Sequence, residues 1–263
     1  SKQLVTILTD VKIDATINDF EKREMDSSKL EDIFKELEFS GLLKKIGSNK
    51  SINIESVKRE KNYNNLITVD QLTSFVSSVK ENEWLSVDLE TTSINPMVAE
   101  IVGFSFSVKK DTGVYVPIRF KDKKDNLFGD DDLHTAIGIL KPILENSNIP
   151  KTGQNIKYDA LIMKRYGINL DGIAFDTMIA AHLISPNSRS YKLDNLSISH
   201  LNYKMVPIKD LIGSGKNQIT MDQVTLEDIS FYAAEDADVV IELTEIFLKE
   251  LKNQKLYNYF MAI

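Results

Sequence analysis

The sequence contains no cysteine and only three histidines among its 263 residues. The lack of cysteine excludes disulfide bonds, thiolate catalysis and zinc sites with cysteine ligands. No apolar run approaches the roughly 20 residues that a membrane-spanning helix needs, and the N-terminal segment lacks the charged, apolar and small-residue pattern of a signal peptide. We therefore expect a cytoplasmic protein that does not associate with membranes.

Hydrophobic residues make up 42% of the chain and charged residues 27%, as is typical of a globular protein. The net charge of −7 argues against a protein that coats nucleic acid non-specifically. It is compatible with an enzyme that contacts a few phosphates. A cluster of carboxylates that binds a divalent metal ion would itself add to the negative balance.

Residues 1–62 differ in pattern from the rest of the chain. A short β-like run is expected at 4–8 and a helix at 28–43, where apolar residues recur at helical spacing. The polar, basic segment around 44–61 is interpreted as a solvated linker rather than a DNA contact. Because the chain begins with Ser1, we expect a fragment of a longer protein.

From residue 63 onward the pattern becomes regular. Strands are expected at 65–69, 84–90, 101–108 and 114–118, and helices at 70–80, 131–145, 156–166, 176–184, 193–201 and 226–252. Asp70 is expected to begin the first of these helices. An antiparallel meander followed by helices indicates a mixed α/β or α+β fold.

Two acidic residues share one face of the strand WLSVDLE. Leu85, Val87 and Leu89 point one way, so Asp88 and Glu90 point the other. At about 7 Å and an effective dielectric constant near 20, their charges repel by roughly 2 kcal/mol. A divalent cation between them would turn this repulsion into attraction, and oxygen ligands suit Mg²⁺ or Mn²⁺. The alternative is a solvated strand face, which this pattern alone favours.

Asp236 lies in an otherwise apolar stripe of the last long helix. A carboxylate in such a stripe needs a partner, and Tyr232 lies one turn earlier on the same face. The alternative is a salt bridge at the edge of the core. Glu235 and Asp238 project from other sides of this helix and are expected to be solvated.

A third acidic residue follows the segment Gly153-Gln154-Asn155, which is expected to close a strand. Asn155 is expected to cap the next helix, which places Asp159 near its first turn. There a favourable interaction with the helix dipole is a good alternative explanation.

The order of these patterns along the chain is more informative than each one alone. A D-x-E strand, N-x-x-x-D after a G-Q turn and Y-x-x-x-D on a late helix resemble the three motifs of DEDD exonucleases with tyrosine in the third motif. The segments 87–96, 152–168, 172–184, 215–220 and 232–240 are similar to the 3′→5′ proofreading domain of the bacterial DNA polymerase I family (family A). The start of the chain, 3–14, resembles the end of the preceding 5′-nuclease domain in that family.

The resemblance implies a ribonuclease H-like fold, in which a mixed sheet with an antiparallel meander and a parallel strand is flanked by helices. It divides the chain into 1–62, the tail of a 5′-nuclease domain and a linker; 63–255, the exonuclease domain; and 256–263, the start of a connection to a polymerase domain. The implied partners are a single-stranded DNA 3′ end and these covalently linked domains, with no membrane and a monomeric chain.

The same resemblance implies catalysis with two divalent ions, Mg²⁺ or Mn²⁺, with Zn²⁺ compatible with one site. Asp88, Glu90 and Asp236 would hold the first ion, and Asp88 and Asp159 the second. Tyr232, with Glu90, would orient the attacking water, and the product would be a nucleoside 5′-monophosphate.

The resemblance also implies DNA contacts by eight residues: Ile94, Gln154, Asn155, Arg189, Lys216, Asn217, Gln218 and Met221. Ile94 takes the place of a leucine wedge near the terminal bases. Met221 stands where an aromatic side chain that stacks on a base is expected, so we expect a weaker grip but retained activity.

Two other functions fit the same residues. One is an RNA 3′ exonuclease of the ribonuclease D type, which shares the carboxylates; the GQNIKYD and YAAEDADVV segments favour the polymerase family. The other is a structural module of a polymerase that has lost proofreading, which the presence of all four carboxylates and Tyr232 disfavours.

Overall fold

The computed structural model describes residues 60–263 throughout and, before them, 5–7, 9–12, 14–16, 21, 25–37, 39 and 42. The chain forms two compact units, Ser1–Asn53 and Ile54–Ile263. In the first unit, helix α2 covers Ser27–Glu36, within the helix predicted at 28–43 apart from its first residue. Residues 5–7 of the run predicted at 4–8 do not form a strand. The rest of that run, much of the predicted helix end and most of the linker lie outside the described residues.

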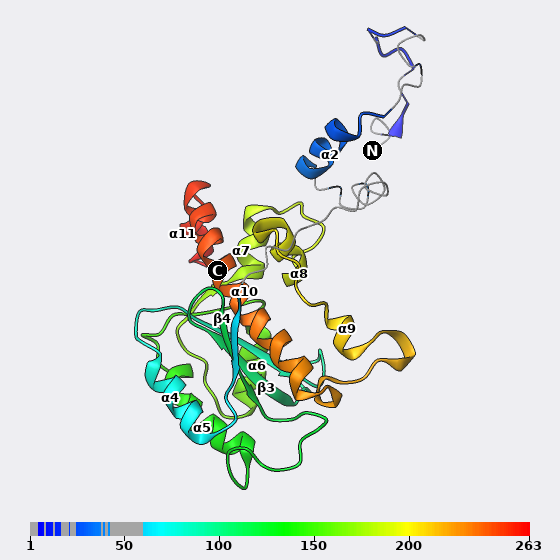
Figure 1. The fold of residues 1–263 in the computed structure, drawn as a ribbon. Coiled ribbons are helices and arrows are strands. Elements are labelled where there is room, and N and C mark those ends of the chain that lie inside the picture. The colour runs from blue at the N-terminus through cyan, green and yellow to red at the C-terminus, as the bar shows by residue number, and fades with distance from the viewer. Residues whose placement is uncertain are drawn as a thin grey trace. The chain divides into compact units, whose positions relative to one another are not determined.

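The second unit is built on a mixed six-stranded sheet in the order β1-β4-β3-β2-β5-β6 (Figure 1). The strands are β1 Asn62–Asn65, β2 Leu85–Thr91, β3 Ile101–Ser107, β4 Thr112–Pro117, β5 Lys151–Gly153 and β6 Ile173–Asp176. β2, β3 and β4 form the predicted antiparallel meander. β1 runs parallel to β4, β5 parallel to β2, and β6 parallel to β5, which completes the predicted mixed sheet.

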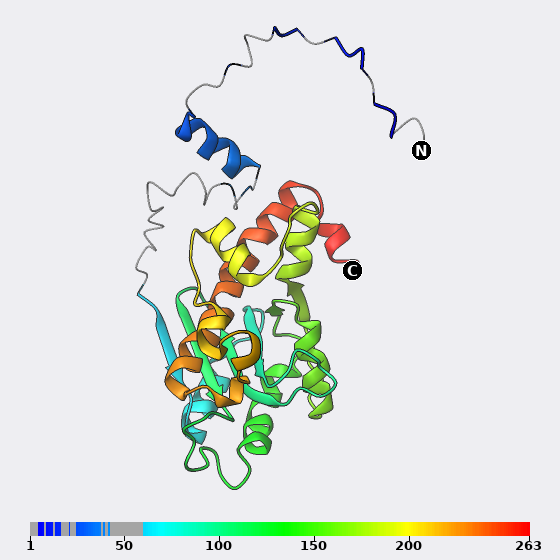
Figure 2. The same ribbon diagram turned by 90° about the vertical axis from the view of Figure 1, so that its right-hand side faces the viewer.

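Helices cover both faces of the sheet (Figures 1 and 2). The helices of the second unit are α4 Val69–Ser78, α5 Asp132–Leu144, α6 Lys157–Arg165, α7 Thr177–Ile184, α8 Leu193–Leu196, α9 Ile208–Ile212, α10 Leu226–Asn253 and α11 Tyr257–Phe260. A π-helical turn, Ser197–Leu201, extends α8, and 3₁₀ turns cover Gly215–Asn217 and Met221–Gln223. None of the helices in the described part of the chain is long and apolar enough to cross a membrane.

The two faces of the meander pack against different helices. Val87 and Leu89 of β2 lie in a large apolar core with residues of α4, α5 and α6. α10 packs across the opposite face, where it contacts β1 to β5. Strand alternation therefore places the polar residues of β2 beneath α10.

Two predicted boundaries were wrong at the start of this unit. The strand predicted at 65–69 is β1 at Asn62–Asn65, a polar strand at the edge of the sheet next to β4. The residues of β1 are polar, so their sequence pattern resembles that of the preceding linker. The N-cap of α4 is Thr68, not Asp70, because the Thr68 side chain accepts a hydrogen bond from the Gln71 amide.

Candidate active site

Strand β2 presents two carboxylates to the face beneath α10. Asp88 pairs in register with Ser105 of β3, and Glu90 pairs with Gly103. The register shifts between Glu90 and Thr91, where β2 ends. Glu90 is 6% exposed, whereas Asp88 is half-buried at the open edge of the same surface.

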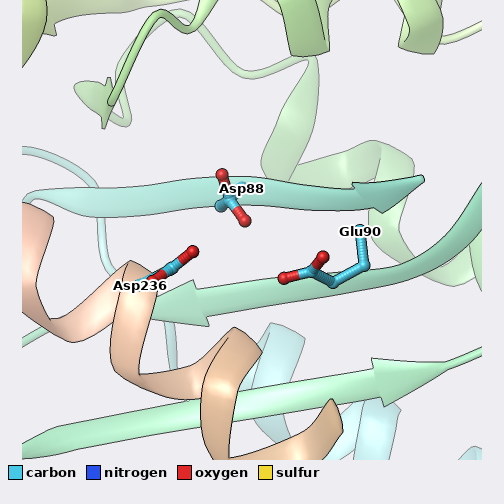
Figure 3. Close-up of side chains that lie close together, drawn as sticks. All are labelled: Asp88, Glu90 and Asp236. Atoms are coloured by element: carbon cyan, nitrogen blue, oxygen red, sulfur yellow. The ribbon is translucent and has the colours of Figure 1, made fainter. Parts of the chain in front are cut away.

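Helix α10 brings the third carboxylate to this surface. Its stripe of buried residues, Ile229, Ala233, Val240, Leu243 and Phe247, packs onto the protein interior as predicted. Asp236, in the middle of this stripe, reaches β2 (Figure 3), and carboxylate oxygens of Asp88, Glu90 and Asp236 all lie within 4.8 Å of one another. The hydroxyl of Tyr232, one turn earlier, acts on Asp236 so as to lower the pKa of that carboxyl, against the larger effect of burial.

Asp159 approaches the same surface from the first turn of α6. It is 3% exposed, and its carboxylate accepts a hydrogen bond of 3.2 Å from the Leu89 amide, between the two acidic residues of β2. The expectation that Asn155 caps this helix was wrong. Asn155 has a left-handed backbone (φ 58°), and its amide and that of Ile156 donate to the Asp176 carboxylate at 3.2 and 3.0 Å.

Asp176 has a structural role that was not predicted from the sequence. Its carboxylate also accepts hydrogen bonds from the Met178 and Ile179 amides, so it caps the start of α7 as well. One side chain thus fixes the starts of two helices, including the helix that carries Asp159. The only sequence signal is an aspartate just before a helical pattern, which predicts the second cap but not the first.

The four carboxylates lie close to one another where little water screens their charges, so their negative charges repel. Burial raises the pKa of Asp88 to about 7, although a hydrogen bond from Ser105 opposes the shift. Burial also raises the pKa of Glu90, Asp159 and Asp236, and repulsion by Asp88 raises each of them further. Among the described residues, no lysine or arginine forms an ion pair with any of the four. An oxygen-only donor set without a protein counter-charge fits a divalent cation.

Asp88, Glu90 and Asp236 line a cleft of about 780 Å³, whereas the buried Asp159 does not line it. Its walls come from the segment after β2, the start of α6, and the stretch from α9 to α10. Of the residues predicted to contact DNA, four line it: Ile94, Asn155, Gln218 and Met221. Ile94 is 96% exposed, as a wedge requires.

The other predicted contact residues do not line this cleft: Gln154, Arg189, Lys216 and Asn217. The Gln154 amide is used within the fold, since it donates to the Tyr191 carbonyl at 2.7 Å and accepts from the Thr177 hydroxyl at 2.6 Å. Met221 is 4% exposed and packs in a small core with Tyr115 and Ile229, so it presents little surface for stacking.

Glu235 and Asp238 were wrongly predicted to be solvated. Glu235 is 1% exposed and accepts hydrogen bonds from the Tyr203 hydroxyl and the Val206 amide. Asp238 is fully buried, because α10 is also covered by β1 and by the turn before β4.

Lys61, expected in the solvated linker, neutralises Asp238. Its ammonium group lies 2.6 Å from Asp238, 2.8 Å from Asp111 and 3.8 Å from Glu242. The Tyr63 hydroxyl donates to the same Asp238 carboxylate at 2.7 Å. This second acidic cluster therefore carries its own cation, unlike the cluster at the cleft.

Sequence comparisons identify relatives of the chain. A profile described as 3′-5′ exonuclease matches residues 63–252. DNA polymerase I of Pseudomonas aeruginosa is 31% identical over 263 aligned residues, which cover 96% of this chain and 28% of that protein. DNA polymerase I of Borreliella burgdorferi is 33% identical over 238 residues, which cover 90% of this chain and 24% of that protein. The chain thus spans less than a third of the length of these relatives.

Solved structures share the fold. Brucella melitensis NrnC with bound Mg²⁺ superposes with a TM-score of 0.55 at 16% identity, over 78% of this chain and 88% of that one. Escherichia coli RNase D also gives 0.55 at 16% identity, over 73% of this chain and 46% of that one. These likenesses support the ribonuclease H-like fold. The profile match and the polymerase relatives show that this chain belongs to the 3′-5′ exonuclease family, in the group formed by the exonuclease domains of bacterial DNA polymerase I.

Proposed function

We propose that the chain hydrolyses the terminal phosphodiester bond of single-stranded or frayed DNA 3′ ends and releases 5′-mononucleotides. The observation that carries this proposal is the meeting of carboxylates from β2 and α10 at one cleft, beside Asp159 of α6, which is bonded to the Leu89 amide. Among the described residues, no lysine or arginine pairs with these carboxylates. If these carboxylates were only solvated surface residues, they would not be expected to converge from separate elements on one cleft. A salt bridge at the edge of the core would include a lysine or arginine.

Asp88, Glu90 and Asp236 would hold one divalent cation, and Asp88 with Asp159 a second. Two such cations, Mg²⁺ or Mn²⁺, would supply Lewis-acid activation of water and stabilisation of the leaving 3′ oxygen. The Tyr232 hydroxyl and the Glu90 carboxylate would orient the attacking water. Burial raises the pKa of Tyr232, so its hydroxyl keeps its proton and can donate a hydrogen bond.

We infer that the cleft takes the end of a single strand. Its volume of about 780 Å³ lies within the range of roughly 300–1,000 Å³ of small-molecule sites, which suits one or two nucleotides. Ile94, Asn155, Gln218 and Met221 would contact the terminal nucleotides. Gln154 would hold the Tyr191 carbonyl and the Thr177 hydroxyl in place and would not contact DNA directly. Arg189, Lys216 and Asn217 would contact the DNA strand farther from the cleaved bond.

In the full protein, the module would act beside covalently linked polymerase and 5′-nuclease domains as a proofreading unit in the cytoplasm. The length of the relatives supports this arrangement, because the aligned part is 28% of the Pseudomonas aeruginosa protein. The chain itself would be a monomer.

A ribonuclease D-like activity on RNA is the second candidate, because Escherichia coli RNase D, described as an exoribonuclease involved in structured RNA processing, has the same fold. Length-resolved digestion of 5′-labelled DNA and RNA strands of one sequence separates the two. We expect stepwise shortening of DNA from the 3′ end with Mg²⁺ or Mn²⁺ and none with a chelator. Preferred degradation of RNA would support the second candidate, and no degradation of either would support a structural module.

Asp88→Ala tests the proposed role of Asp88 between two cations. We expect it to reduce 3′ trimming by at least about a thousandfold, since it removes a ligand of both ions. Circular dichroism should show an intact fold. The matched control is Asp122→Ala, which alters an exposed aspartate and should leave trimming unchanged. Near-wild-type trimming by Asp88→Ala would make the site assignment wrong.

A further inference from the structure

Tyr115 of β4 is a fully buried tyrosine whose hydroxyl has no hydrogen-bond partner among the described residues. Leaving a buried hydroxyl unpaired costs about 1–3 kcal/mol. Phenylalanine would fill the same space without this cost. A buried hydroxyl without a structural partner therefore calls for a functional explanation.

The strand register directs this side chain toward the carboxylates. Tyr115 pairs with Ser105, which pairs with Asp88, so the three residues stand in a row on the face beneath α10. The Tyr115 ring leans along the sheet over Gly103, where an added Cβ atom would lie only 2.3 Å from the hydroxyl oxygen. Gly103 is the register partner of Glu90. The hydroxyl is thus aimed at the place on the sheet that faces Glu90.

The buried neighbours of Tyr115 are mostly apolar. Tyr115 packs in a small core with Val102, Met221, Ile229 and Ala233, which carry no polar side-chain hydrogen-bond donor or acceptor of ordinary strength. Tyr232 also packs against this core, but the Tyr115 hydroxyl forms no hydrogen bond with it. Burial raises the pKa of Tyr115, and the charges of Glu90 and then Asp88 raise it further. The hydroxyl therefore keeps its proton and is available only as a neutral group beside these carboxylates.

We propose that Tyr115 is a positioning residue that donates a hydrogen bond to the Glu90 carboxylate when this carboxylate is charged and binds a divalent cation. The bond would fix the Glu90 oxygens from behind, while Tyr232 acts from the cleft side. Gly103 is then required because any larger residue would displace the Tyr115 ring. This role rests on the proposed divalent-cation site, and it explains why a tyrosine is buried at this position.

The test compares Tyr115→Phe, Asp88→Ala and the control Tyr166→Phe, a tyrosine that does not line the cleft. Mn²⁺ alone is the probe in calorimetric titrations of the whole chain, and thermal unfolding is measured in a chelator. For Tyr115→Phe we expect unchanged or higher metal-free stability, together with Mn²⁺ binding weakened about tenfold to a hundredfold, the usual effect of losing a group that orients a ligand. The kcat for DNA trimming should fall while KM stays similar. Tyr166→Phe should behave like wild type.

Two outcomes would overturn the role of Tyr115. If Tyr115→Phe bound Mn²⁺ as tightly as wild type, the hydroxyl would not act on Glu90. If its metal-free unfolding temperature fell, the hydroxyl would serve the fold instead. Loss of Mn²⁺ binding by Asp88→Ala together with normal binding by Tyr115→Phe would reject this inference alone. Normal binding by both variants would reject the proposed cation site as well.

Discussion

Asp88 lies where its charge is costly, because burial raises its own pKa and its charge raises the pKa of Glu90, Asp159 and Asp236. Its folded-state pKa of about 7 lies above the ordinary aspartate value of 3.8. The folded state therefore binds the proton more tightly than the unfolded state. The stability that this proton provides is fully present below pH about 4 and is lost as the pH rises toward about 7.

Asp88→Asn should remove this pH dependence in part. In a chelator at pH 8, we expect the variant to have a free energy of unfolding higher than wild type by on the order of 2 kcal/mol. At pH 4 the two should be nearly equal. Urea unfolding at both pH values measures the difference, with Asp122→Asn as the exposed control. Equal stability of Asp88→Asn and wild type at pH 8 would show that Asp88 is not under electrostatic strain.

Strand and helix periodicity predicted which acidic residues approach the cleft, because Asp88 and Glu90 alternate with apolar residues and Asp236 interrupts an apolar stripe. Periodicity identified one buried side of α10. It could not show that other elements cover two further sides, and so Glu235 and Asp238 were placed in solvent. Tyr115 was missed for a similar reason, since its neighbours on the sheet depend on the register of three strands.

At the scale of elements, α10 depends on a contact made far away in sequence. Lys61 lies just before β1, and its ammonium group is 2.6 Å from Asp238 of α10. Only the folded pairing of β1 with β4 brings these residues together, so the sequence of the basic segment gave no sign of it.

Lys61→Met should destabilise the chain, because it leaves the Asp238 charge buried without a cation. We expect a loss of about 3 kcal/mol in the free energy of unfolding, as is typical when one partner of a buried pair is removed. Lys80→Met removes an exposed lysine that pairs with Glu83 at 3.3 Å, and it should cost no more than about 0.5 kcal/mol. Urea unfolding compares the two. Equal effects would mean that Lys61 contributes no more than a surface charge.

Asp176→Ala should act on two helices at once. The side chain accepts hydrogen bonds from four backbone amides at the starts of α6 and α7. Since one N-cap contributes about 1 kcal/mol, we expect a loss of about 2 kcal/mol, and slower trimming because α6 carries Asp159. Asp131→Ala is the matched control, because Asp131 caps only α5. If both variants lost the same stability in urea unfolding, Asp176 would cap one helix only.

At the scale of the whole molecule, the meander and the long helices were predictable because each has a clear period. The polar strand β1 and the short strand β6 were not, since four residues carry too little pattern. The overall charge of −7 and a cleft that suits only a few nucleotides indicate weak binding of DNA by this chain alone. Few phosphates can be neutralised, so affinity should also depend little on salt.

The isolated chain should therefore trim matched and mismatched ends at similar rates. The choice between ends would be made partly by a polymerase site in the full protein, which competes for the paired end. The measurement is the ratio of initial trimming rates on two primer–template duplexes that differ only in the last pair, with the free primer as reference. A strong preference for the mismatched end would place the discrimination within this chain.

We propose that Asp88, Glu90, Asp159 and Asp236 bind divalent cations that act on a DNA 3′ end. The most direct measurement is an anomalous diffraction map of crystals that contain Mn²⁺ and a nucleoside 5′-monophosphate. We expect one Mn²⁺ peak among Asp88, Glu90 and Asp236, a second on the side of Asp159, and the phosphate next to both. A map with the nucleotide bound in the cleft and no Mn²⁺ at these carboxylates would contradict it.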